Sequence, residues 1–237
     1  MRIASAAASF LLLSLAAPAA AQEDTDTEAP AGSGLAISGE VNLLSDFRFR
    51  GISRSDEDPA VQAALTLSVP GGFYVGGRGT SLKDAGDLES VQLDLYAGYG
   101  AELGGGTSFD AGLMYFVFPD GTGSTNYFEP YASVSHLLGP VQATLGAKYA
   151  PEQDAIGGED LLYLFGEVEA SIPLTPLTFT AQAGRQDVGA FGDYWTWSLG
   201  ARGNIGPFQA AVRYVDTDLP AVPNADAGLV FSLGVRF

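Results

Sequence analysis

The last ten residues of the chain, Gly228 to Phe237, read GLVFSLGVRF. Every second residue of this stretch is apolar, namely Leu229, Phe231, Leu233, Val235 and Phe237. The residues between them are mainly glycine, serine and arginine. A period of two is typical of a β-strand with one apolar and one polar face. The stretch therefore predicts a strand that reaches the last residue.

The same alternation recurs along the rest of the chain. In its first occurrence the odd positions from Leu35 to Phe49 are mostly apolar, and the even positions from Ser38 to Arg50 are mainly polar. Helical periodicity is absent, and no later stretch has the 18 apolar residues that a membrane-spanning helix needs. We therefore predict an all-β protein. Its twelve expected strands lie at 35–50, 60–69, 72–80, 90–100, 107–118, 127–136, 141–150, 161–171, 177–186, 193–203, 207–216 and 228–237.

The connections between these strands alternate in length and charge. Tight, nearly uncharged turns, such as 70–72 and 137–140, alternate with mostly longer and acidic loops, such as 50–59 and 151–160. Outer-membrane barrels have short periplasmic turns and longer extracellular loops. We therefore expect a single antiparallel transmembrane β-barrel of twelve strands with both termini at the periplasmic end. A soluble β-sandwich is the structural alternative, because it also alternates.

The N-terminal segment has the features of an export signal. Arg2 supplies a positive charge, an apolar run follows from Phe10 to Leu15, and small residues precede Gln22. We expect a cleaved signal peptide at 1–21, a disordered acidic leader at 22–34 and the barrel at 35–237. The protein is then exported through the secretory pathway to the outer membrane of a Gram-negative cell.

The strand that ends the chain resembles an assembly signal. A terminal phenylalanine on an alternating strand is similar to the signal that the outer-membrane barrel assembly machinery reads, and it is carried here by Phe237, Val235 and Leu233. The expected partners are therefore this machinery, periplasmic chaperones, outer-membrane lipid and lipopolysaccharide.

Composition excludes several functional classes. The chain has 28 acidic and 11 basic residues, a net charge of -17, no cysteine and one histidine. Nucleic-acid binding needs a basic face, and thiol chemistry needs cysteine. The histidine, His136, falls on the face opposite Ser133 and Ser135, which argues against a histidine-dependent hydrolase. We expect no enzyme activity, no cofactor and no metal site.

The polar face carries acidic and basic residues in equal number, which favours ion pairs inside the barrel. Arg48 and Arg50, opposed by carboxylates such as Asp46 or Glu129, could create a transverse field at a constriction; alternatively they are structural pairs that brace the wall. The candidate lumen residues are Asp46, Arg48, Arg50, Arg78, Asp94, Glu129, Lys148, Glu167, Arg202 and Arg213.

Two functions remain open at this point. The first is a narrow passive channel for small hydrophilic solutes, which the acidic loops make mildly cation-preferring. The second is a non-conducting structural or adhesion barrel with a filled lumen and loops that bind lipopolysaccharide or another partner. Eight strands leave an interior filled by side chains and sixteen leave a water channel, so twelve is intermediate. Inward tyrosines narrow such a path, and glycines widen it.

Longer stretches resemble a known family. Ser45 to Gln62 reads SDFRFRGISRSDEDPAVQ, Leu93 to Pro119 reads LDLYAGYGAELGGGTSFDAGLMYFVFP, and Asn126 to Ser135 reads NYFEPYASVS. These stretches resemble the TorF family of porin-like proteins, also called the Gcw_chp family of conserved hypothetical proteins. Phe47 stands where tyrosine is expected. The resemblance implies an outer-membrane β-barrel with a porin role and no assigned solute.

Overall fold

A computed structural model describes residues 34–83, 88, 90–219 and 222–237. The expected signal peptide at 1–21, and the leader at 22–34 except for Gly34, lie outside these residues. Within the described part of the chain, no helix is long and apolar enough to cross a membrane. The short helical elements that are described in full are the 3-10 turns η2 (Asp154–Ile156) and η3 (Gly189–Phe191).

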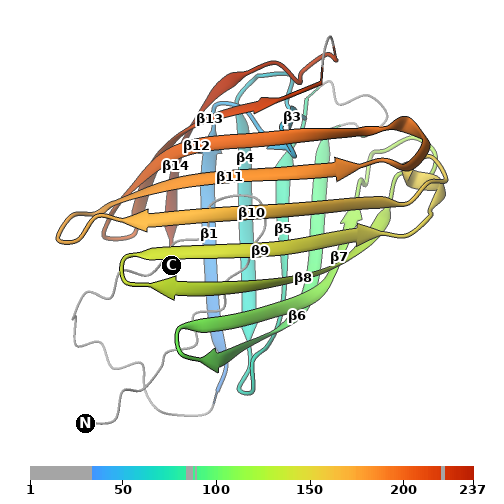
Figure 1. The fold of residues 1–237 in the computed structure, drawn as a ribbon. Coiled ribbons are helices and arrows are strands. Elements are labelled where there is room, and N and C mark those ends of the chain that lie inside the picture. The colour runs from blue at the N-terminus through green and yellow to red at the C-terminus, as the bar shows by residue number, and fades with distance from the viewer. Residues whose placement is uncertain (1–33, 84–87, 89, 220–221) are drawn as a thin grey trace.

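Twelve strands of the described chain form one closed antiparallel barrel (Figure 1). Each barrel strand pairs with the next, and the first pairs with the last. The predicted fold class is confirmed, and a soluble sandwich is excluded. The barrel strands are β1 (Ala36–Leu44), β4 (Ala60–Ser68), β5 (Phe73–Ser81), β6 (Val91–Gly104), β7 (Thr107–Val117), β8 (Tyr127–Leu138), β9 (Val141–Ala150), β10 (Leu161–Ser171), β11 (Leu177–Asp187), β12 (Asp193–Ile205), β13 (Phe208–Thr217) and β14 (Gly228–Arg236).

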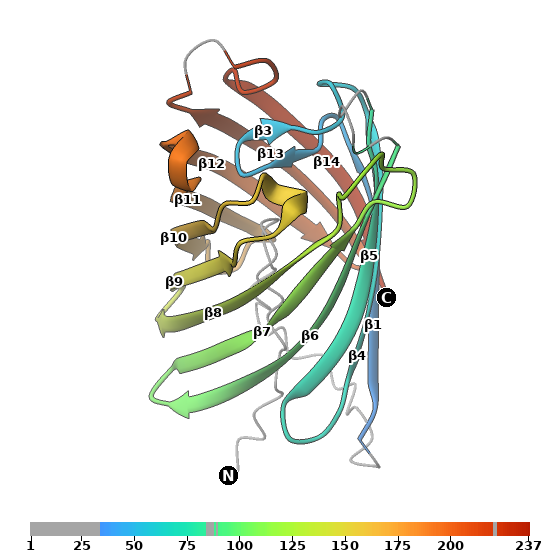
Figure 2. The same ribbon diagram turned by 90° about the vertical axis from the view of Figure 1, so that its right-hand side faces the viewer.

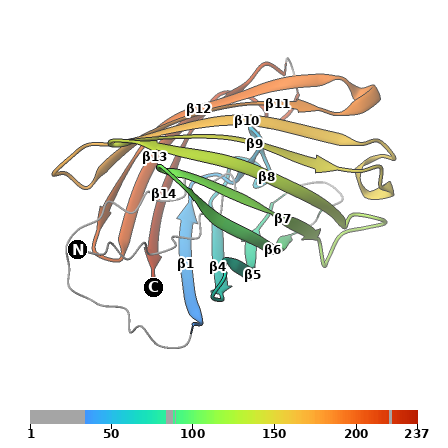
Figure 3. The same ribbon diagram turned by 60° about the horizontal axis from the view of Figure 1, so that its bottom comes forward.

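The barrel has two unlike ends, which we call the turn end and the loop end. Connections at the turn end are short, such as 105–106 between β6 and β7 and 139–140 between β8 and β9. Connections at the loop end are mostly longer, such as 151–160 between β9 and β10. β1 begins and β14 finishes at the turn end (Figure 3). The predicted alternation of connections is therefore present.

The two faces of the wall differ as the alternation predicts. Outward apolar side chains are exposed, including Leu145 at 72% and Leu199 at 60%. Inward polar side chains such as Gln62, Gln92 and Asp94 are fully buried. An apolar outer band around a polar interior is the arrangement of a barrel that stands in lipid.

The seam between β1 and β14 closes the sheet. The Gly39 N–H donates to the Phe237 carbonyl (2.8 Å), and the Phe237 N–H donates to the Gly39 carbonyl (3.0 Å). Farther along, Val235 lies opposite Val41 and Leu233 opposite Leu43. The terminal residues therefore supply both outward apolar side chains and the hydrogen bonds that leave no open edge.

The prediction of a first strand that reaches residue 50 is wrong. β1 ends at Leu44, and the chain then turns into the barrel, so Asp46, Arg48 and Arg50 do not lie on a wall strand. Phe47 is 4% exposed and belongs to the interior cluster, and Phe49 packs against that cluster, so neither side chain lies on the outer face of the barrel.

Candidate constriction inside the barrel

Residues 45–59, between β1 and β4, fold into the loop end of the barrel (Figure 2). We call this segment the inner hairpin. It contains the two-residue strands β2 (Arg48–Phe49) and β3 (Ile52–Ser53), which pair with each other. Its turn places Arg50 at φ 51° and Gly51 at φ 91°. A Cβ on Gly51 would lie 2.3 Å from the Thr217 side chain, so the turn also needs glycine for its close approach to the wall.

The Asp46 carboxylate holds the inner hairpin together from within. It accepts hydrogen bonds from Arg48 Nε (2.5 Å), Ser53 Oγ (2.5 Å) and Ser55 Oγ (3.2 Å). Ser55 Oγ in turn accepts the Phe47 N–H (2.8 Å). All five side chains are buried. These local bonds satisfy polar groups inside the barrel that the ladder of β1, which ends at Leu44, does not reach.

Arg50 ties the tip of the inner hairpin to the far wall. Its guanidinium donates to Glu129 Oε2 on β8 and to Gln186 Oε1 on β11, both at 2.5 Å. Its carbonyl accepts the Tyr194 hydroxyl of β12 (3.2 Å). The side chains of Arg50 and Glu129 are 4% and 0% exposed. Charge-assisted bonds in a site with so little water are strong, and removal of one partner leaves the other charge uncompensated.

Other contacts extend the inner hairpin to the remaining walls. Arg48 Nη1 donates to the carbonyl of Asp226 in the loop before β14 (2.5 Å). Arg54 Nη1 donates to Gln92 Oε1 on β6 (2.6 Å). The Ser53 N–H donates to the Asn224 carbonyl (2.8 Å). The hairpin therefore crosses the interior and reaches strands on opposite sides of the barrel.

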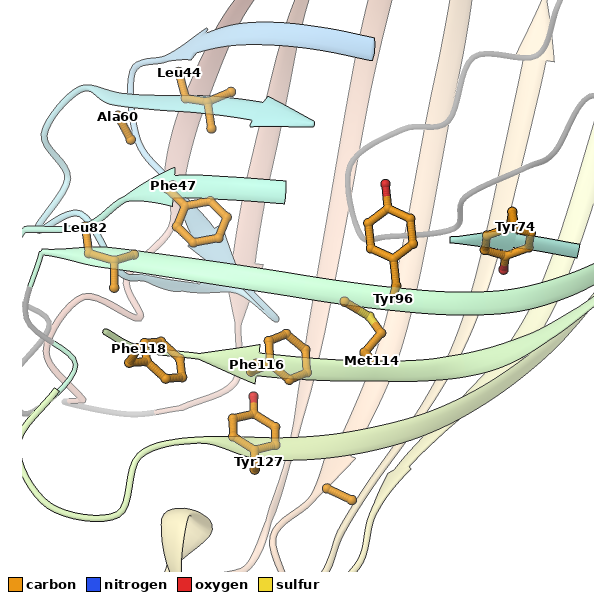
Figure 4. Packing of buried hydrophobic residues seen from close by; sticks show 11 residues of the cluster. Leu44, Phe47, Ala60, Tyr74, Leu82, Tyr96, Met114, Phe116, Phe118 and Tyr127 are labelled. Atoms are coloured by element: carbon orange, nitrogen blue, oxygen red, sulfur yellow. The ribbon is translucent and has the colours of Figure 1, made fainter. Parts of the chain in front are cut away.

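An aromatic cluster fills the space between the inner hairpin and β5 to β8 (Figure 4). The rings of Phe49 and Phe116 meet edge to face at 5.7 Å, and those of Phe116 and Tyr127 stack at 4.6 Å. Phe47 and Met114 belong to the same buried set. On this side the inner hairpin therefore contacts the wall through apolar packing rather than through ion pairs.

The other charged candidates pair along the wall. Arg78 donates to Asp94 on the neighbouring strand (2.5 Å), and Arg202 bonds Glu169 across β11 (2.6 Å). These pairs brace strands without crossing the barrel. Lys148, Glu167 and Arg213 also face the interior, but none forms a hydrogen bond or ion pair with another described residue.

Inward aromatic rings lie against glycines of neighbouring strands. A Cβ at Gly184 would lie 2.3 Å from the Tyr163 hydroxyl, and one at Gly146 would lie 2.4 Å from the Phe165 ring. Tyr96 covers Gly76 in the same way. The rings therefore occupy space at the wall rather than in the middle of the barrel. We expected the inward tyrosines to narrow the path through the barrel and the glycines to widen it. In the structure these two kinds of residue instead pack against each other.

Several inward side chains of the wall are half-buried rather than buried. Inward side chains of β13, β14, β1 and β4 include Arg213, Ser232, Asn42 and Thr66, all half-buried. We call these four residues the inner strip. Towards the turn end, the side chains of Glu40 and Arg236 are 33% and 28% exposed and lie 3.9 Å apart. This wall carries polar side chains, whereas the opposite wall carries aromatic rings such as Tyr163 and Phe165.

The candidate residues thus form three groups. The structure brings Asp46, Arg48, Arg50 and Glu129 together at the inner hairpin. It places Arg78, Asp94 and Arg202 in wall pairs, and it leaves Lys148, Glu167 and Arg213 without direct partners among the described residues.

Sequence reasoning missed three residues that hold the hairpin, Gln92, Gln186 and Tyr194. The alternation along each strand predicts that these side chains point inward. It does not predict which neutral polar side chains contact a loop.

His136 lies on the exposed outer face near the turn end, where its Nδ1 is 2.9 Å from Thr107 Oγ1. Ser133 and Ser135 are buried on the inner face, as their positions predict. The histidine therefore has no serine partner in a hydrolase-like arrangement.

Solved structures with a similar fold include outer-membrane proteins. The KdgM porin, solved in complex with disordered oligogalacturonate, superposes with a TM-score of 0.58 at 11% identity and covers 85% of this chain and 97% of its own. An outer-membrane channel from Pseudomonas putida F1 has a TM-score of 0.53 at 12% identity and covers 91% of this chain and 99% of its own. At these identities the likeness establishes the fold.

No curated protein matches the sequence. Residues 28–230 match the model of a family described as bacterial proteins of unknown function, under the name Gcw_chp; the name TorF does not come with this match. Since the match spans most of the chain, the protein belongs to the Gcw_chp family.

Proposed function

We propose that the protein is a porin-like channel of the outer membrane, through which small hydrophilic solutes diffuse passively. The observation that carries this proposal is that the barrel contains both the inner strip and the inner hairpin. Polar, half-buried side chains line one wall, and a segment of the chain itself narrows the loop end. Diffusion of this kind requires no catalytic group and no cofactor.

Side chains alone can fill the interior of an eight-stranded barrel, and a sixteen-stranded barrel leaves a wide water channel. The interior of a twelve-stranded barrel is intermediate in size. A barrel of this size needs a loop to make it narrow, and the inner hairpin supplies one. The fold shared with the KdgM porin and the Pseudomonas channel supports the same class of function.

In this proposal the exported protein stands in the outer membrane with its exposed apolar face in lipid. The loop end faces outward, and the assembly machinery, assisted by periplasmic chaperones, reads the terminal strand that carries Leu233, Val235 and Phe237. These residues suit that role because they are apolar, face outward and end at the seam.

The acidic residues of the loop end give the channel a mild cation preference in this proposal. Glu152, Asp154 and Asp160 lie in the loop between β9 and β10, and Asp120 and Asp218 lie in other loops at the same end. Their summed potential concentrates cations at the mouth and repels anions. The effect falls with ionic strength, since exposed charges are screened over about 10 Å at 0.1 M salt.

A second candidate is a non-conducting structural or adhesion barrel. The observation in its favour is the nearly complete burial of the side chains around the inner hairpin, including Glu129, Gln92 and Phe116. Its acidic loops would meet lipopolysaccharide phosphates through bridging divalent cations, which prefer oxygen ligands. Chelation of those cations should then lower thermal stability and membrane insertion.

Single-channel recording of the refolded protein in planar bilayers separates the two candidates. The channel proposal predicts small discrete conductance steps and a reversal potential of cationic sign under a salt gradient. Heat-modifiable mobility in gel electrophoresis shows independently that the barrel has folded. A folded barrel that stays electrically silent contradicts the channel proposal and supports the structural one.

A further inference from the structure

One of the five hairpin connections at the turn end differs from the others in the residue at its tip. The other four connections carry glycine where the backbone has a positive φ. The connection between β10 and β11, residues 172–176, instead carries Leu174 at φ 64°. The glycines of the other four are Gly71, Gly72, Gly105, Gly106, Gly139 and Gly206.

The backbone at Leu174 is unfavourable for a leucine. The Thr175 N–H donates to the Ile172 carbonyl (3.1 Å), and Pro173 precedes Leu174. A proline followed by a residue of positive φ is the pattern of a type II turn, which normally has glycine or asparagine at the second of these places. In a leucine the Cβ crowds the following carbonyl oxygen. The turn therefore retains a side chain that weakens it.

Packing within the barrel does not offset this strain. Leu174 is the most exposed large apolar side chain among the described residues. A strained backbone persists where something else stabilises the residue, and such positions are often functional. For Leu174 that stabilisation must come from outside the chain.

The apolar outer face of the wall continues to this tip. On β10 and β11, Ala170 lies opposite Phe179 in register, and both face outward. The next outward pair is Ile172 and Leu177, where the Ile172 N–H donates to the Leu177 carbonyl (2.9 Å). Leu174 follows directly at the tip. The surface that stands in lipid is therefore continuous with Leu174.

The backbone of this turn suits a medium without water. The Thr175 hydroxyl donates to the Ile172 carbonyl (2.9 Å) and accepts the Leu177 N–H (3.3 Å). Pro173 and Pro176 have no N–H to satisfy. Within residues 172–177 of the described chain, only the Leu174 N–H has no hydrogen-bond acceptor. Unsatisfied N–H groups are costly in hydrocarbon, so this turn can enter it at little cost.

We propose that Ile172, Leu174 and Leu177 form an anchor that inserts into the acyl chains of the lipid leaflet at the turn end. Burial of the leucine side chain in hydrocarbon offsets the strain of its backbone. The anchor sets how deep the β10–β11 side of the barrel stands in the membrane. This inference rests on the outer-membrane placement in the proposed function, and it does not depend on conduction.

Spin labels on single cysteines test the position of the tip in lipid vesicles. Oxygen concentrates in hydrocarbon, whereas a water-soluble nickel chelate is excluded from it. A label on Leu174→Cys should collide more with oxygen than with the chelate. Leu145→Cys on the outer face is the lipid reference, and Glu152→Cys in an exposed loop is the water reference.

The references separate failure of the anchor from failure of the membrane placement. A label that lies in water at 174 and in lipid at 145 overturns the anchor alone, and would leave the tip available to a periplasmic protein. Labels that lie in water at both positions overturn the anchor and the membrane placement together. Heat-modifiable mobility in gel electrophoresis shows that each labelled barrel has folded.

Leu174→Asn tests the same contact through stability, because asparagine tolerates a positive φ. If Leu174 stood in water, this change would relieve the backbone and raise the urea midpoint of unfolding from vesicles. The anchor predicts a lower midpoint, since the contact with lipid is lost. Leu145→Asn should lower the midpoint as well.

Gly139→Asn is the matched control for Leu174→Asn. It places asparagine at the tip of the neighbouring turn, where φ is 60° and a Cβ meets open space. No apolar group is removed, so the midpoint should change little. An unchanged or higher midpoint in Leu174→Asn contradicts the anchor, as does a loss in Gly139→Asn that equals the loss in Leu174→Asn.

Discussion

The two ends of the barrel interior satisfy their polar side chains in different ways. At the loop end, the inner hairpin reaches across the barrel, and Arg50 bonds Glu129 and Gln186 of the far wall. Towards the turn end, charged groups pair along the wall, as Arg202 does with Glu169. The first end is packed from wall to wall, whereas the second keeps half-buried groups such as Glu40 and Arg236.

This difference shows what a twelve-stranded wall can do by itself. Side chains of the wall reach their neighbours and lie against glycines, as Tyr163 does at Gly184. They do not bridge the full width of the barrel. Where the interior is closed, a segment of chain has been folded into it. The constriction is therefore a property of residues 45–59 rather than of the wall.

The largest change should come from removal of the inner hairpin. Replacement of residues 46–57 by a short glycine-serine linker should leave the barrel closed, because the pairing of β1 with β14 and β4 does not include those residues. We expect a conductance several times that of the intact protein. Single-channel recording measures it, and unchanged conductance in a heat-modifiable barrel would show that the hairpin is not the constriction.

Loss of the Arg50 side chain should have the next largest effect. Arg50→Ala leaves the buried Glu129 without its partner, and breaking such a pair costs about 3–5 kcal/mol. The hairpin should loosen, with flickering current and a lower midpoint in chemical unfolding. A second change, Glu129→Gln, should restore part of that stability.

The matched control for Arg50 is Arg185→Ala, since Arg185 pairs with Asp193 on the exposed surface. Exposed pairs contribute about 0–1 kcal/mol. If Arg185→Ala destabilised the protein as much as Arg50→Ala, burial would not be the reason for the Arg50 effect.

A methyl group beneath an inward ring should narrow the barrel from the wall. Gly184→Ala places a Cβ 2.3 Å from the Tyr163 hydroxyl, so the ring must swing towards the middle. We expect a smaller conductance than that of the unmodified chain. Gly77→Ala is the control, because its Cβ meets the flexible end of Leu95 at 3.3 Å on the outer face. Equal losses in both variants would point to general misfolding.

The smallest effect concerns the charge of the mouth. Glu152→Gln with Asp154→Asn removes two exposed charges that no ion pair of the described chain uses. The reversal potential should move slightly towards zero in dilute salt and stay unchanged at about 1 M, where screening acts over roughly 3 Å. A shift that persists at high salt would assign the selectivity to the interior instead.

The sequence alone predicted the wall accurately for a physical reason. A strand with one face in lipid and one in the interior must alternate, so each wall strand shows its period of two locally. The inner hairpin carries the same local pattern, in Phe47, Arg48, Phe49 and Arg50, and for that reason it was predicted as a continuation of the first strand. Only distant partners distinguish the two arrangements, and a single sequence does not display them.

The charges illustrate the same limit. Parity placed Arg78, Asp94, Arg202 and Lys148 inside the barrel, and the structure agrees. The alternation predicts on which face of the wall a side chain lies, but it does not predict the partner of that side chain. Partners depend on strand register and on how far side chains reach across the barrel. Gln186 and Tyr194, which bond Arg50, were not predicted because the candidate residues were chosen by charge and these two side chains are neutral.

Cysteine accessibility tests the division of the interior most directly, since the chain contains no cysteine of its own. Thr196 is 7% exposed and lies against Gly51 of the inner hairpin, whereas Ser232 lies half-buried on the inner strip. In single-cysteine variants, a small hydrophilic thiol reagent should modify Ser232→Cys quickly and Thr196→Cys slowly, and removal of the hairpin should make the second reaction fast. Equal rates in the intact barrel would contradict the account.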